Sequence, residues 1–249
     1  MTESSLHFLD VAGRRIATRR REGGTPTLLF LSGYASDMTG EKATAIDAFA
    51  GERGIACLRL DYSGTGESGG EFAEGTLADW VEEALAVLDS AAAGPVLVIG
   101  SSLGGWVALH LALRRPDRVA ALLGIAAAPD FTQWGFTESQ KHVIVREGLL
   151  EEENPYGGEP SRVYRAFWES GQELRLLEDP IAIDCPVRLI HGEDDPTVPL
   201  DVSHRLMRQL RSADVQLLTI KGARHRLSEP NEIGAILNTL AGLLENLPR

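Results

Sequence analysis

The stretch "VLVIGSSLGGWVAL" (residues 96–109) joins an apolar run to two serines, a glycine pair and a helical pattern. Gly100, Ser102 and Gly104 fit the pattern G-x-S-x-G, whereas Ser101 lacks glycines at both required positions. In this pattern a nucleophilic serine lies on a sharp turn from a strand into a helix, where side chains two residues away would collide. The spacing predicts Ser102 as a nucleophile, and a plain strand-to-helix turn is the alternative.

A serine becomes a useful nucleophile when a base, itself oriented by a carboxylate, accepts its proton. One known arrangement has the chain order serine, acid, histidine. The segment "HGEDDPTVP" offers Asp194 and Asp195, and "KGARHRLSEP" then offers His225. The pattern H-G-x-x-D-x-x-V-P favours Asp195 as the acid, with Asp194 as the alternative. Position favours His225 among the six histidines, while His191 is expected to make local hydrogen bonds.

Acyl transfer also needs two N–H donors for the charge that develops on the carbonyl oxygen. The backbone amide of Leu103, directly after the serine, is the first candidate. The second is the amide of Tyr34 in the loop "SGYASDMTG", where Gly33 allows the backbone to turn. A simple connection between a strand and a helix is the alternative for this loop.

Other chemistries find no support in the sequence. It contains no C-x-x-C, no H-E-x-x-H and no His/Asp cluster with metal spacing. The segment "LSGYASDMTG" lacks G-x-G-x-x-G, and the glycine-rich "DYSGTGESGG" is not followed by G-K-[ST]. We therefore expect neither a metal nor an organic cofactor.

The composition of the 249 residues is that of a globular chain, with 43% hydrophobic and 24% charged residues. The net charge of -12 disfavours binding to nucleic acid or to anionic membranes, since both need a basic surface. No signal peptide or apolar run of about 18 residues is found, so we expect no transmembrane anchor. Cys57 and Cys185 are expected to be buried thiols, and the protein is expected to be cytoplasmic.

Short apolar runs alternate with helical patterns, which favours an α/β fold with a doubly wound parallel sheet. The runs are continuous, as in strands that are buried on both faces. They are Thr27–Leu31, Ile55–Leu60, Pro95–Gly100, Val119–Ile125, Pro186–Gly192 and Val215–Ile220. The opening "LHFLDVAGRRIATRR" predicts an antiparallel hairpin at the edge of this sheet.

The alternation stops from about residue 130 to residue 184, where no strand is predicted. Short helical patterns rich in aromatic residues fill this segment, which we interpret as an inserted lid. Trp134, Phe136 and Trp168 are its candidate substrate-binding residues, on the hypothesis of an apolar acyl pocket. The alternative is that these aromatic side chains form a small core of the lid itself.

Four segments carry a family resemblance: "FLSGYASDMTGEKA", "LRLDYSGTGESGG", "IGSSLGGWVALHLALRRPDRVAALLGIAAAPD" and "DCPVRLIHGEDDPTVP". The chain resembles the α/β-hydrolase superfamily, and within it a branch of mitochondrial acyl-protein (palmitoyl) thioesterases and acyl-glucuronide esterases, as a bacterial-type relative. The resemblance implies a single α/β-hydrolase domain over residues 1–249. Its sheet is mostly parallel and twisted, with helices on both faces and a small helical lid before the strand that carries the acid. The family's triad corresponds to Ser102, Asp195 and His225.

We therefore expect a serine hydrolase that cleaves ester or thioester bonds of small-molecule or lipidated acyl substrates through an acyl-enzyme. The same scaffold could also carry a lyase or a peracid-forming reaction, or serve as a non-hydrolytic binding protein. Turnover of generic acyl esters separates a hydrolase from a binding protein. The acyl chain length, the leaving group and the oligomeric state are left open by the sequence.

Overall fold

A computed structural model describes residues 4–153, 157 and 160–247 of the chain. Eight strands form one sheet, in which the first two neighbouring pairs are antiparallel and all the others are parallel. Across the sheet they are β1 (Ser5–Val11), β2 (Arg14–Arg21), β4 (Ile55–Leu60), β3 (Gly24–Leu31), β5 (Val96–Ser101), β6 (Val119–Ile125), β9 (Val187–Gly192) and β10 (Val215–Ile220). The mostly parallel sheet and the antiparallel edge hairpin are as predicted.

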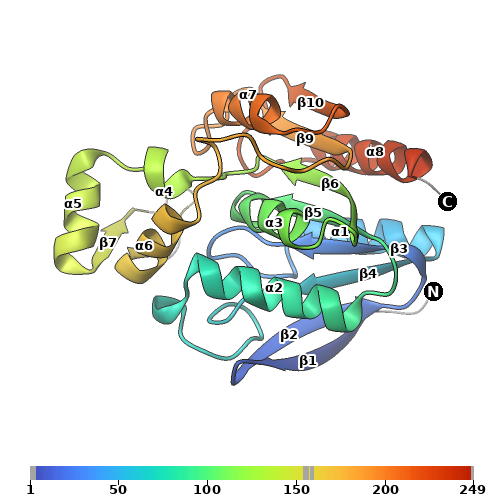
Figure 1. Ribbon diagram of the computed structural model, residues 1–249, viewed down its shortest axis with the longest axis horizontal. Helices are drawn as coiled ribbons and strands as arrows, with labels where there is room; N and C mark the ends of the chain where they lie inside the picture. Colours follow the sequence, from blue (N-terminus) through green and yellow to red (C-terminus); the bar gives the residue numbers. More distant parts are fainter. Residues whose placement is uncertain (1–3, 154–156, 158–159, 248–249) are drawn as a thin grey trace.

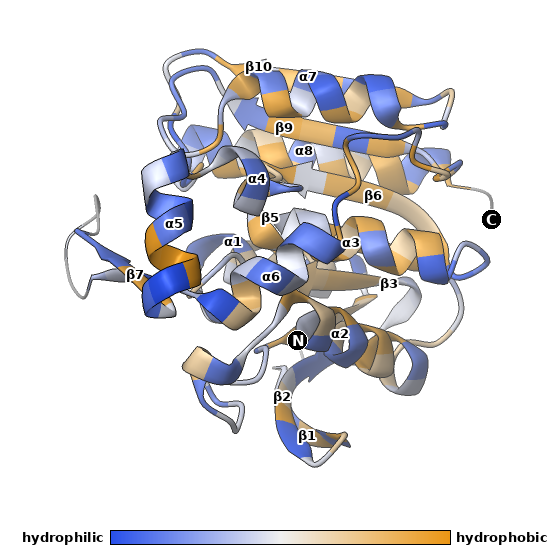
Figure 2. Cartoon of the chain, turned by 60° about the vertical axis from the view of Figure 1, so that its left-hand side comes forward, coloured by the Kyte–Doolittle hydropathy of each residue, from blue (hydrophilic) through white to orange (hydrophobic). Residues whose placement is uncertain are grey.

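Helices cover both faces of the sheet (Figure 1). The main ones are α1 (Glu41–Arg53), α2 (Leu77–Ala91), α3 (Leu103–Arg114), α7 (Leu200–Gln209) and α8 (Pro230–Asn246), with a short 3-10 helix η1 at Phe72–Glu74. Side chains of α1 and α8 share one buried cluster with the sheet, and those of α2, α3 and α7 share the other. In Figure 2 apolar residues gather on the central strands, while α7 alternates apolar and polar residues. This confirms the α/β-hydrolase fold class.

Parallel strands in the middle of the sheet are apolar on both sides because each side meets a helix layer. On β5, Val96 and Val98 face the cluster with α2 and α3, whereas Leu97 and Ile99 face the cluster with α1 and α8. All four side chains are fully buried. The last strand, β10, differs from the prediction: among the described strands it pairs only with β9, and it is half exposed because it is the edge of the sheet.

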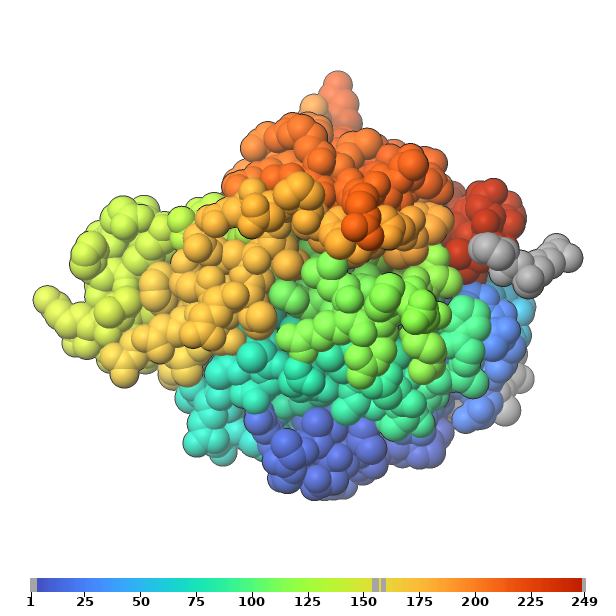
Figure 3. Space-filling view, in the orientation of Figure 1, coloured from blue at the N-terminus to red at the C-terminus, as the bar shows by residue number. Residues whose placement is uncertain are grey.

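The stretch between β6 and β9 holds the predicted lid segment, residues 130–184, which we call the insert. It contains α4 (Phe131–Trp134), α5 (Glu138–Glu147), β7 (Leu149–Glu152), β8 (Ser161–Tyr164) and α6 (Arg165–Glu173). The prediction that this segment has no strand is wrong, because β7 and β8 pair as an antiparallel hairpin. Figure 3 shows the insert as a lobe beside the main body, in yellow-green and gold.

The start of the insert is tied to the segment that follows α6. Asp130 is buried at its start, and its carboxylate accepts hydrogen bonds from the amides of Leu176 and Leu177, each at 2.8 Å. The carbonyl of Leu174, at the end of α6, faces the indole N–H of Trp106 at 3.1 Å and Nε2 of His110 at 3.0 Å. Because Trp106 and His110 lie on α3, the helix that follows Ser102 also anchors the insert.

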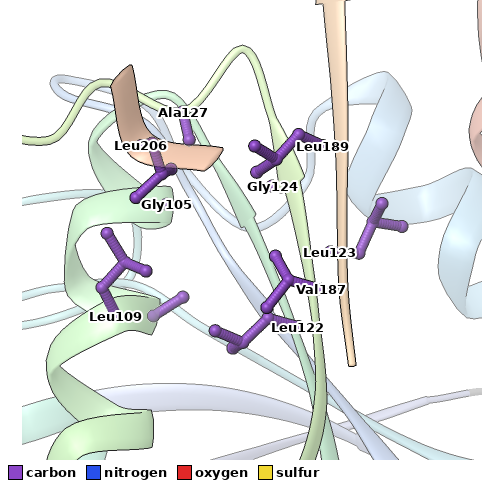
Figure 4. Close-up of a pocket in the computed structure, with 10 residues that line it drawn as sticks. Gly105, Leu109, Leu122, Leu123, Gly124, Ala127, Val187, Leu189 and Leu206 are labelled. Carbon is purple, nitrogen blue, oxygen red and sulfur yellow. The ribbon is translucent and has the colours of Figure 1, made fainter. Parts of the chain in front are cut away.

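Behind α3 lies a gap of about 10 Å³ that is lined by apolar residues (Figure 4). Leu109 of α3, Val187 and Leu189 of β9, and Leu206 of α7 are among them. An apolar gap of this size stays dry and belongs to the packing of the core rather than to a binding site. None of the described helices has the length and apolar character needed to cross a bilayer.

Candidate active site

Ser102 occupies the turn between β5 and α3 in a conformation that side chains seldom adopt, with φ 53° and ψ -117°. Two glycines make the turn possible. A Cβ on Gly100 would lie 2.3 Å from the carbonyl oxygen of Gly104, and one on Gly104 would lie 2.1 Å from that of Leu31. The amide of Ser102 donates to the carbonyl of Ile125 in β6 at 2.9 Å, and its carbonyl accepts from the amide of Ala128 at 3.0 Å, which ties the turn to β6 and the chain after it. The local fold therefore holds Ser102 under strain at the carboxyl edge of the sheet.

His225 lies in the loop between β10 and α8 and reaches Ser102 from across the sheet. Its Nε2 is 3.1 Å from Oγ of Ser102, and its Nδ1 is 2.8 Å from Oδ2 of Asp195. A carboxylate can only accept, so Nδ1 carries the proton and donates to Asp195. The neutral ring then offers Nε2 as the acceptor for the hydroxyl of Ser102, which is the arrangement that a general base requires.

Asp195 follows β9 and has a fully buried side chain. Its Oδ1 accepts hydrogen bonds from the amides of Thr197 and Val198, at 2.8 and 2.9 Å. Burial raises the pKa of Asp195, but hydrogen bonds from His191 and His225 outweigh it and hold that pKa well below its usual range. Asp194, the alternative acid, is exposed, and it is Asp195 that contacts His225.

His191, at the end of β9, is a second imidazole that contacts the carboxylate of Asp195. Its Nε2 lies 2.9 Å from the carbonyl oxygen of Val198 and 3.3 Å from Oδ2 of Asp195. Since both neighbours are acceptors, Nε2 carries the proton, and Nδ1 accepts from the hydroxyl of Ser203 at 2.7 Å. Sequence reasoning anticipated local hydrogen bonds here but missed the contact with Asp195. The spacing of four residues before the acid was the available signal.

Of the two residues predicted to supply oxyanion donors, Leu103 follows Ser102 in the chain, and Tyr34 lies in a turn that is next to Ser102 in space. Leu103 is the first residue of α3, so its amide has no partner within the helix. Tyr34 lies in a turn that is closed by a 3.2 Å hydrogen bond from the amide of Ser36 to the carbonyl of Gly33. A Cβ on Gly33 would be 3.4 Å from the Cβ of Ser102, so this turn abuts the serine. The role of both amides stays a prediction.

Ser102 and His225 open into a cleft of about 930 Å³. The insert contributes apolar side chains to its lining, namely Phe131, Trp134, Phe136, Leu150 and Val163. The first turn of α1 and the loop after His225 contribute polar ones, namely Glu41, Lys42, Arg226 and Ser228. The ammonium group of Lys42 donates to the carbonyl of Arg226, which joins these two segments. We call the five apolar residues of the insert the apolar side of the cleft, to which the insert also contributes Glu152, Ser161 and Arg162, and the four polar residues the polar side.

Two of the three predicted substrate-binding aromatics, Trp134 and Phe136, line the cleft, whereas Trp168 does not. The indole N–H of Trp168 donates to the carbonyl of Thr132 at 3.0 Å, which links α6 to α4 inside the insert. Trp168 thus fits the alternative interpretation, in which aromatic side chains of the lid pack against the lid itself. Within the ranges that the structure describes, no cluster of three or more His, Cys, Asp or Glu side chains could hold a metal ion.

Comparison with known proteins shows which family the chain belongs to. Residues 28–233 match the family model described as "Alpha/beta hydrolase family". The mitochondrial palmitoyl-protein thioesterase ABHD10 of Homo sapiens is 36% identical over 250 residues, which cover 98% of this chain and 82% of that protein. The corresponding protein of Mus musculus is 38% identical over 251 residues, which cover 98% of this chain and 84% of that protein.

Solved structures agree with this match over nearly the whole chain. The alpha/beta hydrolase domain-containing protein 10 from mouse superposes with a TM-score of 0.91 at 36% identity, covering 97% of this chain and 98% of that chain. A putative hydrolase from Agrobacterium vitis S4 superposes with a TM-score of 0.90 at 36% identity and with the same coverage.

Proposed function

The chain belongs to the alpha/beta hydrolase family, and from this premise we propose that it is a serine hydrolase that cleaves ester or thioester bonds of acyl substrates. One observation carries the proposal: Asp195, His225 and Ser102 form a continuous hydrogen-bonded chain, and Ser102 lines the cleft in a strained backbone conformation. The names of the mammalian relatives support a palmitoyl-protein thioesterase type of activity.

The proposed reaction begins when Oγ of Ser102 attacks the acyl carbon while Nε2 of His225 accepts its proton. Asp195 stabilises the imidazolium that forms, because its carboxylate faces Nδ1. The amides of Leu103 and Tyr34 donate to the oxyanion. His225 then returns the proton to the leaving oxygen or sulfur atom. Water, with His225 again as the base, hydrolyses the acyl-enzyme and releases the carboxylic acid.

The different polarity of the two sides of the cleft supports one orientation of the bound substrate. The leaving atom must come within reach of Nε2 of His225, so the leaving group lies toward the polar side with Lys42, Arg226 and Ser228. The acyl chain then extends toward the apolar side, against Phe131, Trp134 and Phe136 as well as Leu150 and Val163 of the hairpin. Trp134 and Phe136 are thus proposed to bind the acyl group.

The test is kcat/KM for matched oxyesters and thioesters over a series of acyl chain lengths, with Ser102→Ala as the blank. We expect turnover that the variant loses, together with loss of labelling by a fluorophosphonate probe. Ser101→Ala is the matched control, since it removes the neighbouring hydroxyl and leaves the Ser102–His225 contact in place. Equal turnover by the wild type and Ser102→Ala would refute the proposal. Preference for long-chain thioesters would support the thioesterase type, and preference for short oxyesters a carboxylesterase.

A further inference from the structure

Tyr34 connects the turn beside Ser102 to the insert. Its hydroxyl donates to the carbonyl of Arg162 at 2.9 Å, and Arg162 lies on β8 of the insert's hairpin. Burial raises the pKa of Tyr34 above its usual value, so the hydroxyl keeps its proton and stays a donor at neutral pH. A single side chain thus joins two segments that are far apart in the sequence and that both line the cleft.

The ring of Tyr34 is held from both sides. Phe131 and Phe167 of the insert lie 5.9 and 4.8 Å from it, measured between ring centroids. Phe72 and Trp80 of the main body lie at 5.2 and 5.9 Å. These distances are those of favourable aromatic pairs. The ring therefore has little freedom, and a shift of the insert must move Tyr34 or break its contacts.

The backbone of this turn depends on support from outside. Ala35, directly after Tyr34, has φ 52°, in the left-handed region that is strained for a residue other than glycine. Gly33, directly before Tyr34, lies against the Cβ of Ser102. A small relaxation of the strained turn would therefore move the amide of Tyr34 relative to Ser102.

We propose that Tyr34 is a positioning residue: its hydroxyl, held by the carbonyl of Arg162, couples the insert's hairpin to the amide that stabilises the oxyanion. This inference rests on the proposed function. Leu150 and Val163 of the same hairpin line the cleft, so an acyl chain that packs on them also fixes Arg162. The coupling makes the chemical step respond to the length of the acyl chain.

Tyr34→Phe tests the proposal because it removes the hydroxyl and keeps both the ring and the amide. We expect kcat for long acyl chains to fall about 10-fold, which is part of the loss that follows removal of a whole oxyanion donor. KM should change little, and the dependence of kcat on chain length should flatten. The Ki of a long-chain trifluoromethyl ketone, whose adduct with Ser102 carries an oxyanion, should rise by the same factor as kcat falls.

Tyr62→Phe is the matched control. Tyr62 stacks on Trp80 at 5.3 Å in the same aromatic region, and within the described part of the chain its buried hydroxyl has no hydrogen-bond partner. Its loss should leave kcat and the Ki of the ketone unchanged. An equal fall of kcat in both variants would point to general packing and overturn the proposal. Unchanged kcat and Ki in Tyr34→Phe at every chain length would do the same.

Amide hydrogen exchange separates this inference from the proposed function, because it needs no turnover. Tyr34→Phe should speed exchange at residues 34–36 and at the β7–β8 hairpin, whereas Tyr62→Phe should not. If the wild type hydrolyses no acyl substrate, the proposed function fails and the exchange data alone decide whether the coupling exists. Exchange that is unchanged at both segments would refute it.

Discussion

The carboxylate of Asp195 accepts from four directions at once. Two amides donate to Oδ1, and the imidazoles of His191 and His225 face Oδ2. A neutral amide at this position would present an NH₂ group to one of these donors, whichever way it is turned. The identity of this one side chain therefore decides whether His225 is held in the tautomer that a base needs.

Asp195→Asn should lower kcat by about 10³- to 10⁴-fold, because His225 loses the partner that orients its ring and stabilises its charged form. The measurement is kcat near neutral pH on an acyl ester, with Ser102→Ala as the background. Asp194→Asn, at the exposed neighbour, should retain full activity. A larger loss in Asp194→Asn than in Asp195→Asn would assign the acid to Asp194.

The sequence was most informative where function depends on local spacing. The roles of Ser102 and Asp195 could be predicted from the surrounding glycines and from the loop pattern, because steric demands and turn geometry act over a few residues. The contact between Tyr34 and Arg162 could not be predicted from the sequence, since it depends on how the insert packs against the main body. Trp168 shows the same limit: its aromatic character did not reveal that it faces Thr132 rather than the cleft.

At the scale of elements, α3 serves both the serine at its start and the insert along its length. His110 makes this second contact pH-dependent, because burial lowers its pKa to about 4, whereas a histidine in an unfolded chain has a pKa of about 6.5. Between these values the unfolded chain binds a proton that the folded chain does not, so stability is lost as the pH falls from about 6.5 to about 4.

The wild type should therefore lose up to about 3 kcal/mol more unfolding free energy than His110→Gln between about pH 7 and about pH 4. Glutamine keeps an N–H donor for the carbonyl of Leu174 but does not titrate. Urea unfolding of both proteins at the two pH values measures the difference. Parallel losses in the two proteins would show that His110 does not contribute to the pH dependence.

The elements that escaped prediction are short and half exposed. The strands β7 and β8 have four residues each and mix apolar with charged side chains, so neither gives the continuous apolar run of the central strands. They pair with each other outside the main sheet, which a local pattern does not specify. The strand β10 was placed correctly, but its sequence did not reveal that it would form an edge of the sheet and stay half exposed.

At the scale of the whole molecule, the buried residues that stabilise the fold are separate from the residues that perform the chemistry. Leu240→Ala, in the buried cluster between α8 and the sheet, should lower the unfolding free energy by about 2–5 kcal/mol. It should leave kcat/KM unchanged while the protein is folded, because the cleft lies at the carboxyl edge of the strands. Leu218→Ala, the same change at an exposed position of β10, should be nearly neutral. A fall in kcat/KM for Leu240→Ala, measured well below its melting temperature, would contradict this separation.

The carboxylate of Asp130, at the start of the insert, binds the amides of Leu176 and Leu177 after α6, so the lobe between these residues is closed on itself. A segment whose ends already meet can be shortened, lengthened or replaced without redirecting the strands on either side of it. The lobe between these residues is thus a cassette, and a graft from another member of the family, joined at these residues, must bring both a new acyl wall and a carbonyl that accepts from the hydroxyl of Tyr34. Substrate range can then evolve, or be engineered, by exchange of this lobe under one constraint, which is that the contact with Tyr34 is rebuilt.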